Sequence, residues 1–76
     1  MPPLPSLSGS DVVRVLKTFA WEVARQRGSH IILVKIGSLA TLSVPDHRIV
    51  AKGTLRSLIR AADLTLSQFV EVANEL

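Results

Sequence analysis

The order of hydrophobic periods along the chain leaves few folds open, because helical spacing occupies both ends of the sequence and strand-like patterns occupy the middle. Ser8 to Asp11 offers N-cap residues and a first-turn acid, and an apolar stripe of helical spacing follows. A second stripe follows Thr54 and a third follows Thr65, and both threonines are candidate N-caps. The three stripes are Val12, Val15, Leu16 and Phe19, then Leu55, Leu58, Ile59 and Ala62, and then Leu66, Phe69, Val70 and Ala73.

Three strands are predicted between the first two helices. Residues 21–26 alternate along the chain as in a strand that buries one face, and Gly28-Ser29 ends this strand. His30–Ile36 is β-branched and apolar, residues 39–44 form a third strand, and Gly37-Ser38 between them predicts a two-residue hairpin turn. The first strand would carry Trp21, Val23 and Arg25 on one face and Glu22, Ala24 and Gln26 on the other.

This element order predicts one domain over residues 1–76, preceded by a flexible proline-rich lead in residues 1–7. We expect an α+β fold, a two-layer α-β-β-β-α sandwich with a short extra C-terminal helix, similar in element order to the double-stranded-RNA-binding domain. Helices can cover only one face of such a sheet. Both faces of the second strand are apolar, so the uncovered face is predicted to bind a partner or a second copy.

Composition narrows the class of function. The chain has no cysteine, which fits a reducing compartment, and its start lacks the pattern of a secretory signal, so we expect a cytoplasmic protein without a membrane span. Six scattered acids, no cysteine and no HExxH motif predict that neither a metal nor another cofactor is used. All nine lysine and arginine residues lie within residues 1–60, and the charged residues of 61–76 are all acidic. A basic body favours a polyanionic partner such as a nucleic acid.

His30 is the candidate catalytic residue, since it follows Gly28-Ser29 at a predicted strand start. Imidazole can both accept and donate a proton near neutral pH, as cleavage of an RNA phosphodiester requires. Gly28 would let a substrate approach the backbone closely. A lone histidine is more often a surface residue without a catalytic task, and the same holds for His47 in the loop after the third strand.

Basic residues near these histidines are candidates for phosphate contacts. Lys52, Arg56 and Arg60 recur every four residues, which places the two arginines on one face of the second helix. The free backbone N–H groups at its start, near Thr54, would favour phosphate as well. A solvated helix face is the commoner meaning of such spacing. The predicted RNA-binding set consists of Arg27, Gly28, Ser29, Lys35, His47, Lys52, Thr54, Arg56 and Arg60.

Three short motifs occur together in one order: Gly28-Ser29-His30 at a strand start, Val44-Pro45-x-His47 with any residue at position x, and the run Lys52–Ile59. In this arrangement, with Leu7-Ser8-Gly9 upstream, residues 7–70 resemble the HicA (YcfA-like) toxin family. Members usually have glycine where this chain has Ala20.

The resemblance implies a compact fold like the double-stranded-RNA-binding domain and an mRNA interferase activity, that is, an endoribonuclease toxin of a type II toxin–antitoxin system. The family's catalytic histidine falls on His30. The resemblance also implies neutralisation by a HicB-like antitoxin. We expect either a homodimer or a hetero-oligomer with this antitoxin. Two other functions stay open for the same fold: a non-catalytic RNA-binding module and a protein-interaction subunit.

Overall fold

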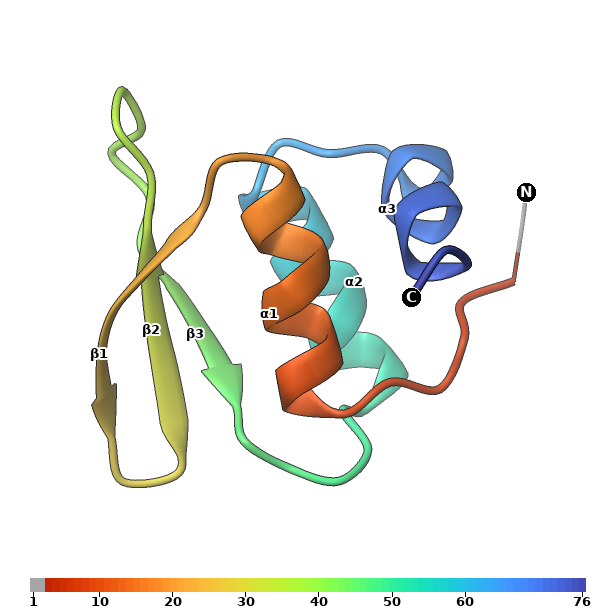
Figure 1. Ribbon diagram of the computed structural model, residues 1–76, viewed down its shortest axis with the longest axis horizontal. Helices are drawn as coiled ribbons and strands as arrows, with labels where there is room; N and C mark the ends of the chain where they lie inside the picture. The colour runs from red at the N-terminus through yellow and green to blue at the C-terminus, as the bar shows by residue number, and fades with distance from the viewer. Residues whose placement is uncertain (1–2) are drawn as a thin grey trace.

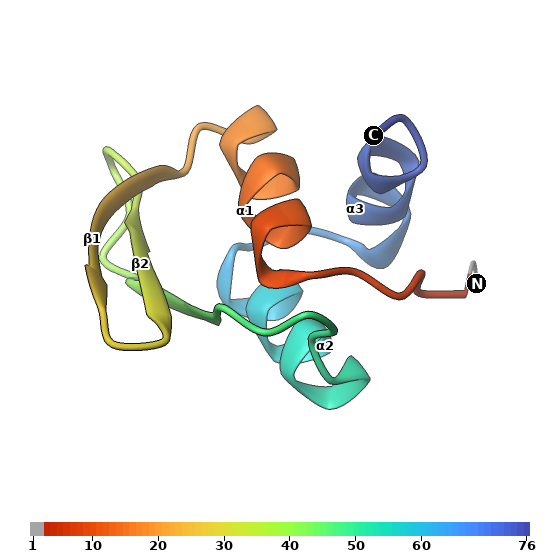
Figure 2. The ribbon, with the colours of Figure 1, turned by 60° about the horizontal axis from the view of Figure 1, so that its bottom comes forward.

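The computed structural model describes residues 3–76 and has the element order that the sequence predicts. A helix, α1 (Gly9–Thr18), precedes three strands, β1 (Glu22–Arg27), β2 (His30–Val34) and β3 (Leu42–Pro45), and two helices follow, α2 (Lys52–Ala61) and α3 (Leu66–Ala73). The strands form one antiparallel sheet in the order β1-β2-β3. All three helices lie on one side of this sheet (Figures 1 and 2). The predicted α+β, two-layer architecture with a C-terminal helix is therefore confirmed.

Local signals place the ends of α1 and α3. The hydroxyl of Ser8 accepts a hydrogen bond from the backbone N–H of Asp11, and the Asp11 carboxylate accepts one from Ser8 in return. Thr65 and Gln68 make the same reciprocal pair at α3, which confirms Thr65 as its N-cap. After α1, Ala20 takes a φ of 71°, a left-handed conformation that glycine adopts at lower cost.

Thr54 is not the N-cap of the second helix, contrary to the prediction. The helix begins at Lys52 with Ala51 as its N-cap, and no side chain caps it. The N–H of Leu55 already donates to the carbonyl of Ala51, so Thr54 lies inside the first turn. The capping preference of threonine is weaker here than the constraint from the preceding loop, where Val50 is buried and its N–H donates to the carbonyl of Leu7.

The connection between β2 and β3 is longer than predicted. β2 ends at Val34 and β3 begins at Leu42, so the prediction of a two-residue turn at Gly37-Ser38 is wrong. A turn closes instead between the carbonyl of Lys35 and the N–H of Ser38, with Gly37 at a φ of 88°. The side chains of Ile36 and Leu39 in this connection point into solvent.

The predicted buried face of the first strand is also wrong. Trp21 is buried just before the strand, yet all six residues of β1 are exposed. The register explains this, because Val23 pairs with Leu33 and Arg25 with Ile32, which leaves Ala24 as the extra residue of a β-bulge. Beyond the bulge the alternation of side chains is reversed, so Arg25 does not share a face with Trp21 and Val23.

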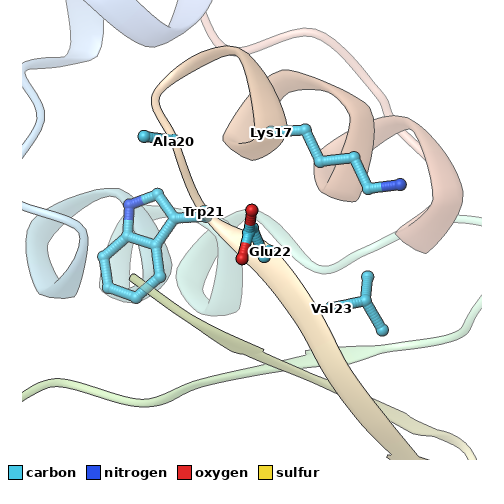
Figure 3. A pocket seen from close by; sticks show the side chains of 5 residues that line it. All are labelled: Lys17, Ala20, Trp21, Glu22 and Val23. Atoms are coloured by element: carbon cyan, nitrogen blue, oxygen red, sulfur yellow. The ribbon is translucent and has the colours of Figure 1, made fainter. Parts of the chain in front are cut away.

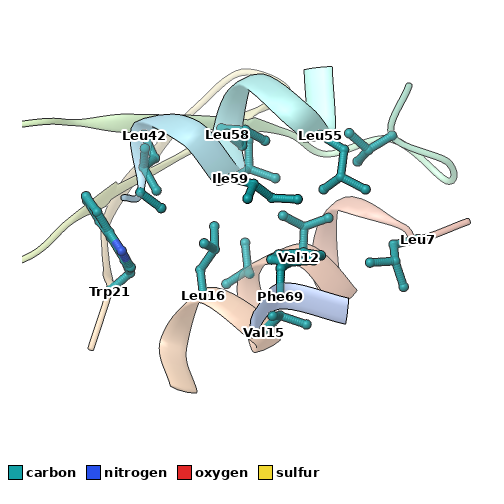
Figure 4. Packing of buried hydrophobic residues seen from close by; sticks show 14 of the residues in the cluster. Leu7, Val12, Val15, Leu16, Trp21, Leu42, Leu55, Leu58, Ile59 and Phe69 are labelled. Atoms are coloured by element: carbon teal, nitrogen blue, oxygen red, sulfur yellow. The ribbon is translucent and has the colours of Figure 1, made fainter. Parts of the chain in front are cut away.

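The core lies among the three helices and extends to the inner face of the sheet (Figure 4). It combines the buried stripes of all three helices with inward side chains of β2 and β3, and Trp21 and Leu7 lie at opposite ends of the cluster in this view. Trp21 and Phe69 are buried, whereas Phe19 is only half-buried against the core. Leu7 is buried although it belongs to the lead predicted to be flexible, and residues 1 and 2 of that lead lie outside the described residues.

Candidate active site

His30 begins β2 directly after the tight turn of Gly28 and Ser29. Gly28 has a φ of 57°, a conformation that favours glycine, and nothing lies within 4 Å of where its Cβ would be. The His30 side chain is exposed, and its Nδ1 atom is 3.3 Å from the hydroxyl oxygen of Ser43 on β3. This hydrogen bond orients the ring and uses one nitrogen, which leaves Nε2 for a substrate.

The loop after β3 lies against the His30 end of the sheet. The N–H of Asp46 donates to the carbonyl of Ser29 at 2.7 Å, and the side-chain amide of Gln26 donates to the Asp46 carboxylate at 3.3 Å. The carbonyl of His47 accepts a hydrogen bond from the N–H of Gly9. These bonds join the β1–β2 turn, the loop and the start of α1, and they bring the exposed His47 to the same end of the molecule as His30.

Gly9 permits this close approach of α1 to the loop. A Cβ at this position would lie 2.3 Å from the carbonyl oxygen of Pro45, a distance that no real contact allows. Pro45 is itself the β3 partner of His30 in the sheet. The Leu-Ser-Gly sequence before α1 therefore has a physical role, since it lets the helix layer pack directly against the strand that flanks the candidate catalytic residue.

Arg27 belongs to the same surface as His30. The two residues are paired across the β1–β2 turn, and directly paired residues of antiparallel strands project to the same side of a sheet. That side is the outer face, because Ile31 and Leu33, with the opposite parity on β2, contact the core. The structure thus brings together four of the predicted residues, namely Arg27, Gly28, Ser29 and His30, with His47 beside them.

Lys35 is not part of this group. It follows β2 at the strand's other end, and its ammonium nitrogen lies 6.0 Å from the centre of the Trp21 ring. This geometry fits a cation–π contact, which accounts for its half-buried position.

The basic residues of α2 are farther from the sheet end that carries His30, because a loop separates α2 from β3. The loop runs from β3 to the first turn of α2 (Figure 1), where Thr54 is exposed and the Lys52 ammonium donates to the carbonyl of Leu4 at 2.5 Å. Arg56 and Arg60 line a shallow hollow of about 180 Å³ with residues of the α2–α3 connection. They therefore lie on the surface of the helical layer and not on the outer face of the sheet.

Another hollow, of about 480 Å³, lies at the junction of α1 and β1 (Figure 3). Its lining consists of Lys17, Ala20, Trp21, Glu22 and Val23. Glu22 pairs with Val34, at the end of β2 opposite to His30, so this hollow is separate from the candidate active site. Within residues 3–76, no three histidine or acidic side chains are grouped so that they could share a metal ion, and no helix has the length and hydropathy of a bilayer span.

Comparison with protein families gives one result that decides the family. The family model described as "HicA toxin of bacterial toxin-antitoxin" matches residues 9–64, which is most of the chain. The chain belongs to the HicA toxin family. The predicted membership is confirmed, and with it a role as a toxin of a toxin–antitoxin pair. No curated protein matches the chain.

Sequence reasoning missed two residues of the candidate site. Ser43, which contacts His30, lies in a strand whose register had to be known before the two could be paired. Arg25 shares the outer face only because of the bulge at Ala24, and residue alternation alone places it on the wrong side. Gln26 and Asp46, which connect the turn to the loop, carry no local motif either.

Proposed function

We propose that this HicA-family chain is a metal-independent endoribonuclease that cleaves mRNA, with His30 as its general acid and base. The observation that carries the proposal is the exposed imidazole of His30, oriented through Nδ1 by Ser43 and placed on the same sheet face as Arg27. An oriented imidazole beside a guanidinium supplies a proton-transfer group and a positive charge, which are two of the requirements of phosphodiester cleavage.

The proposed step uses the ribose of the substrate as its own nucleophile. His30 Nε2 takes the proton of the 2′-hydroxyl, the 2′ oxygen bonds to the adjacent phosphorus, and the bond from phosphorus to the 5′ oxygen breaks. The proton is delivered to the departing 5′ oxygen. The products are a 2′,3′-cyclic phosphate and a 5′-hydroxyl, so no metal ion or other co-reactant takes part. His47, a lysine or solvent supplies the second proton-transfer group.

RNA contacts are proposed at the His30 end of the molecule first. Arg27 offsets the phosphate charge, and the Gly28-Ser29 turn permits close approach of the backbone. His47 in the adjoining loop and the first turn of α2, with Lys52 and Thr54, extend this surface. The other members of the predicted set are Lys35, Arg56 and Arg60.

A HicB-like antitoxin in the cytoplasm is the proposed protein partner, and the proposed assembly is a hetero-oligomer with this antitoxin or a homodimer of this chain. Ile36 and Leu39 support a protein partner, since large apolar side chains in solvent are common at interaction sites. Sedimentation of the chain alone and with a HicB-like antitoxin tests this partner. A monomer that binds no such antitoxin would contradict it.

Cleavage of a purified mRNA in EDTA tests the proposed reaction. Wild type, His30→Ala and His47→Ala are purified identically, and the product ends are analysed. We expect His30→Ala to lose cleavage by about 10²- to 10⁴-fold while it keeps its fold and its RNA binding. We also expect cyclic phosphate at the new 3′ ends.

Other outcomes point to other functions. Equal cleavage by wild type and His30→Ala would assign the chemistry to another residue or to a contaminant, and a 5′-phosphate with a 3′-hydroxyl would exclude the proposed step. Binding of RNA by wild type without cleavage would favour the non-catalytic RNA-binding module. RNA affinity that is absent, or independent of salt, would favour the protein-interaction subunit.

A further inference from the structure

The bulge in β1 gives the sheet a basic outer face around His30. Arg25 pairs with Ile32 and Arg27 with His30, so both guanidinium groups are on the face opposite to the core. Without the extra residue at Ala24, the strand would place Arg25 and Arg27 on the same side as Trp21, which is 2% exposed. The bulge therefore allows Trp21 to be buried while both arginines are exposed.

These arginines are not neutralised within the chain. Among residues 3–76 the only ion pair within 4.0 Å joins Arg14 to Asp11 on α1. Both β1 arginines are exposed, and they lie on the sheet face opposite to the helices, so no helix covers them. Two exposed cations without a carboxylate partner, next to an oriented imidazole, are a favourable environment for an anionic ligand.

The spacing of the two arginines fits an extended polyanion. Residues two apart on one strand face are separated by about 6.7 Å, twice the rise per residue. Successive phosphates of an extended single nucleic-acid strand are separated by a similar distance. His30 is paired with Arg27 across the turn, so the phosphate bound by Arg27 would also lie beside the imidazole.

We propose that the outer face of the sheet, through Arg25 and Arg27, binds the phosphates of single-stranded RNA that lead to His30. The inference rests on the proposed function and specifies the path of its substrate. It also assigns the main phosphate contacts to the sheet rather than to Arg56 and Arg60, which lie on the helical side of the molecule. The outer face favours RNA over a protein partner because it offers little apolar surface at its centre. Its central apolar residue, Ile32, is only 8% exposed, and its partners on the two neighbouring strands are Arg25 and Ser43.

Binding assays in a cleavage-deficient background test this path. Each variant carries His30→Ala, and anisotropy of a labelled, unstructured RNA of about 12 nucleotides is measured in EDTA over a range of salt. The test variant is Arg25→Gln/Arg27→Gln. Arg56→Gln/Arg60→Gln and Arg14→Gln/Lys17→Gln remove the same charge from α2 and from α1. A duplex of about 16 base pairs is the competing probe.

We expect the β1 variant to weaken binding of the single strand about tenfold and to lower the salt slope by about 1.4, since each phosphate contact contributes about 0.7 for single strands. The α2 variant should weaken it less than the β1 variant does, and the α1 variant should stay within about twofold of the background. Arg25→Lys/Arg27→Lys should keep most of the affinity. Because β1 is exposed along its whole length, these variants should melt like the background.

Three results would overturn the path. They are an α2 variant that loses as much affinity as the β1 variant or more, a duplex that binds as tightly as the single strand, and a β1 variant that loses binding to an antitoxin but not to RNA. The cleavage assay with wild type is separate. Cleavage by wild type with an unaffected β1 variant would reject the path and keep the ribonuclease, whereas the expected binding pattern without cleavage would keep the path and reject the ribonuclease.

Discussion

The two faces of β2 differ in kind although their residues alternate along one backbone. Leu33 is fully buried and Ile31 contacts the core, whereas His30 on the other face is exposed and bonded to Ser43. The inner face of β2 is apolar and contacts the core, whereas the outer face combines the exposed imidazole of His30 with the apolar side chains of Ile32 and Val34. We infer that alternate residues of β2 serve different purposes. Mutation of an inner residue should lower the stability of the fold, whereas mutation at the His30 site on the outer face should lower the cleavage rate.

Deletion of Ala24 should produce the largest effect on this separation. Without the bulge, either Trp21 or the two arginines must change sides, and loss of a buried tryptophan typically costs about 3–5 kcal/mol. Thermal unfolding followed by circular dichroism measures the cost. Ala24→Ser keeps the residue count and should stay within about 0.5 kcal/mol of wild type, because Ala24 is exposed. A deletion variant with wild-type melting and cleavage would show that the bulge does not set the faces.

Leu33→Ala should lower the free energy of unfolding by about 2–5 kcal/mol, because a fully buried side chain leaves a cavity. That is a large part of the roughly 4–11 kcal/mol expected for a chain of 76 residues. Urea titration measures the change. Its neighbour Val34, which is 39% exposed, is the control, and Val34→Ala should cost less than about 1 kcal/mol. Equal costs at the two positions would contradict the assignment of the faces.

Gly9→Ala should affect both faces at once, since Gly9 belongs to the helix layer but touches Pro45, the β3 partner of His30. Overpacking of this kind costs about 1–3 kcal/mol, and the shift of Pro45 should also slow cleavage. Parallel melting and cleavage assays measure the two effects. Gly53→Ala has open space around its Cβ and should stabilise α2 by up to about 1 kcal/mol. Loss of stability without any change in cleavage would show that the loop does not couple the two layers.

Ser43→Ala should give the smallest effect, confined to the outer face. Ser43 is a positioning residue for His30, and a net hydrogen bond is worth about 0.5–1.5 kcal/mol, so kcat should fall about 2- to 10-fold. KM and the melting temperature should not change. Ser43→Thr retains the hydroxyl and should restore most of kcat. If Ser43→Thr is as slow as Ser43→Ala, the hydroxyl does not orient the imidazole.

Signals that act over a few residues were predictable from the sequence. The N-caps Ser8 and Thr65 satisfy backbone groups within their own turns, so residue type and spacing were sufficient. His30 at the start of a strand was predicted in the same way, from the Gly-Ser turn before it. The prediction of Thr54 as an N-cap was wrong because the loop before α2 is held by the buried Val50. The helix therefore begins before the residue that is best suited to cap it.

Features that depend on register were not predictable. The alternation of residues 21–26 is compatible with an unbroken strand, and only pairing with β2 shows that Ala24 is extra. The contact between Ser43 and His30 and the exposure of Arg25 follow from that same pairing. The predicted RNA-binding set includes Lys35, at the far end of β2, and lacks Arg25, which is closer to His30 along the sheet and which we propose as a phosphate contact.

Trp21 offers a fluorescence signal for the unfolding measurements. It is the only tryptophan of the chain, there is no tyrosine, and the indole is almost fully buried where α1 passes into the sheet. Its fluorescence emission should therefore lie toward the blue in the native protein and move to the red on unfolding. Substitutions on the outer face should leave this spectrum unchanged. The protein thus contains a natural optical probe that reports on the inner layer alone.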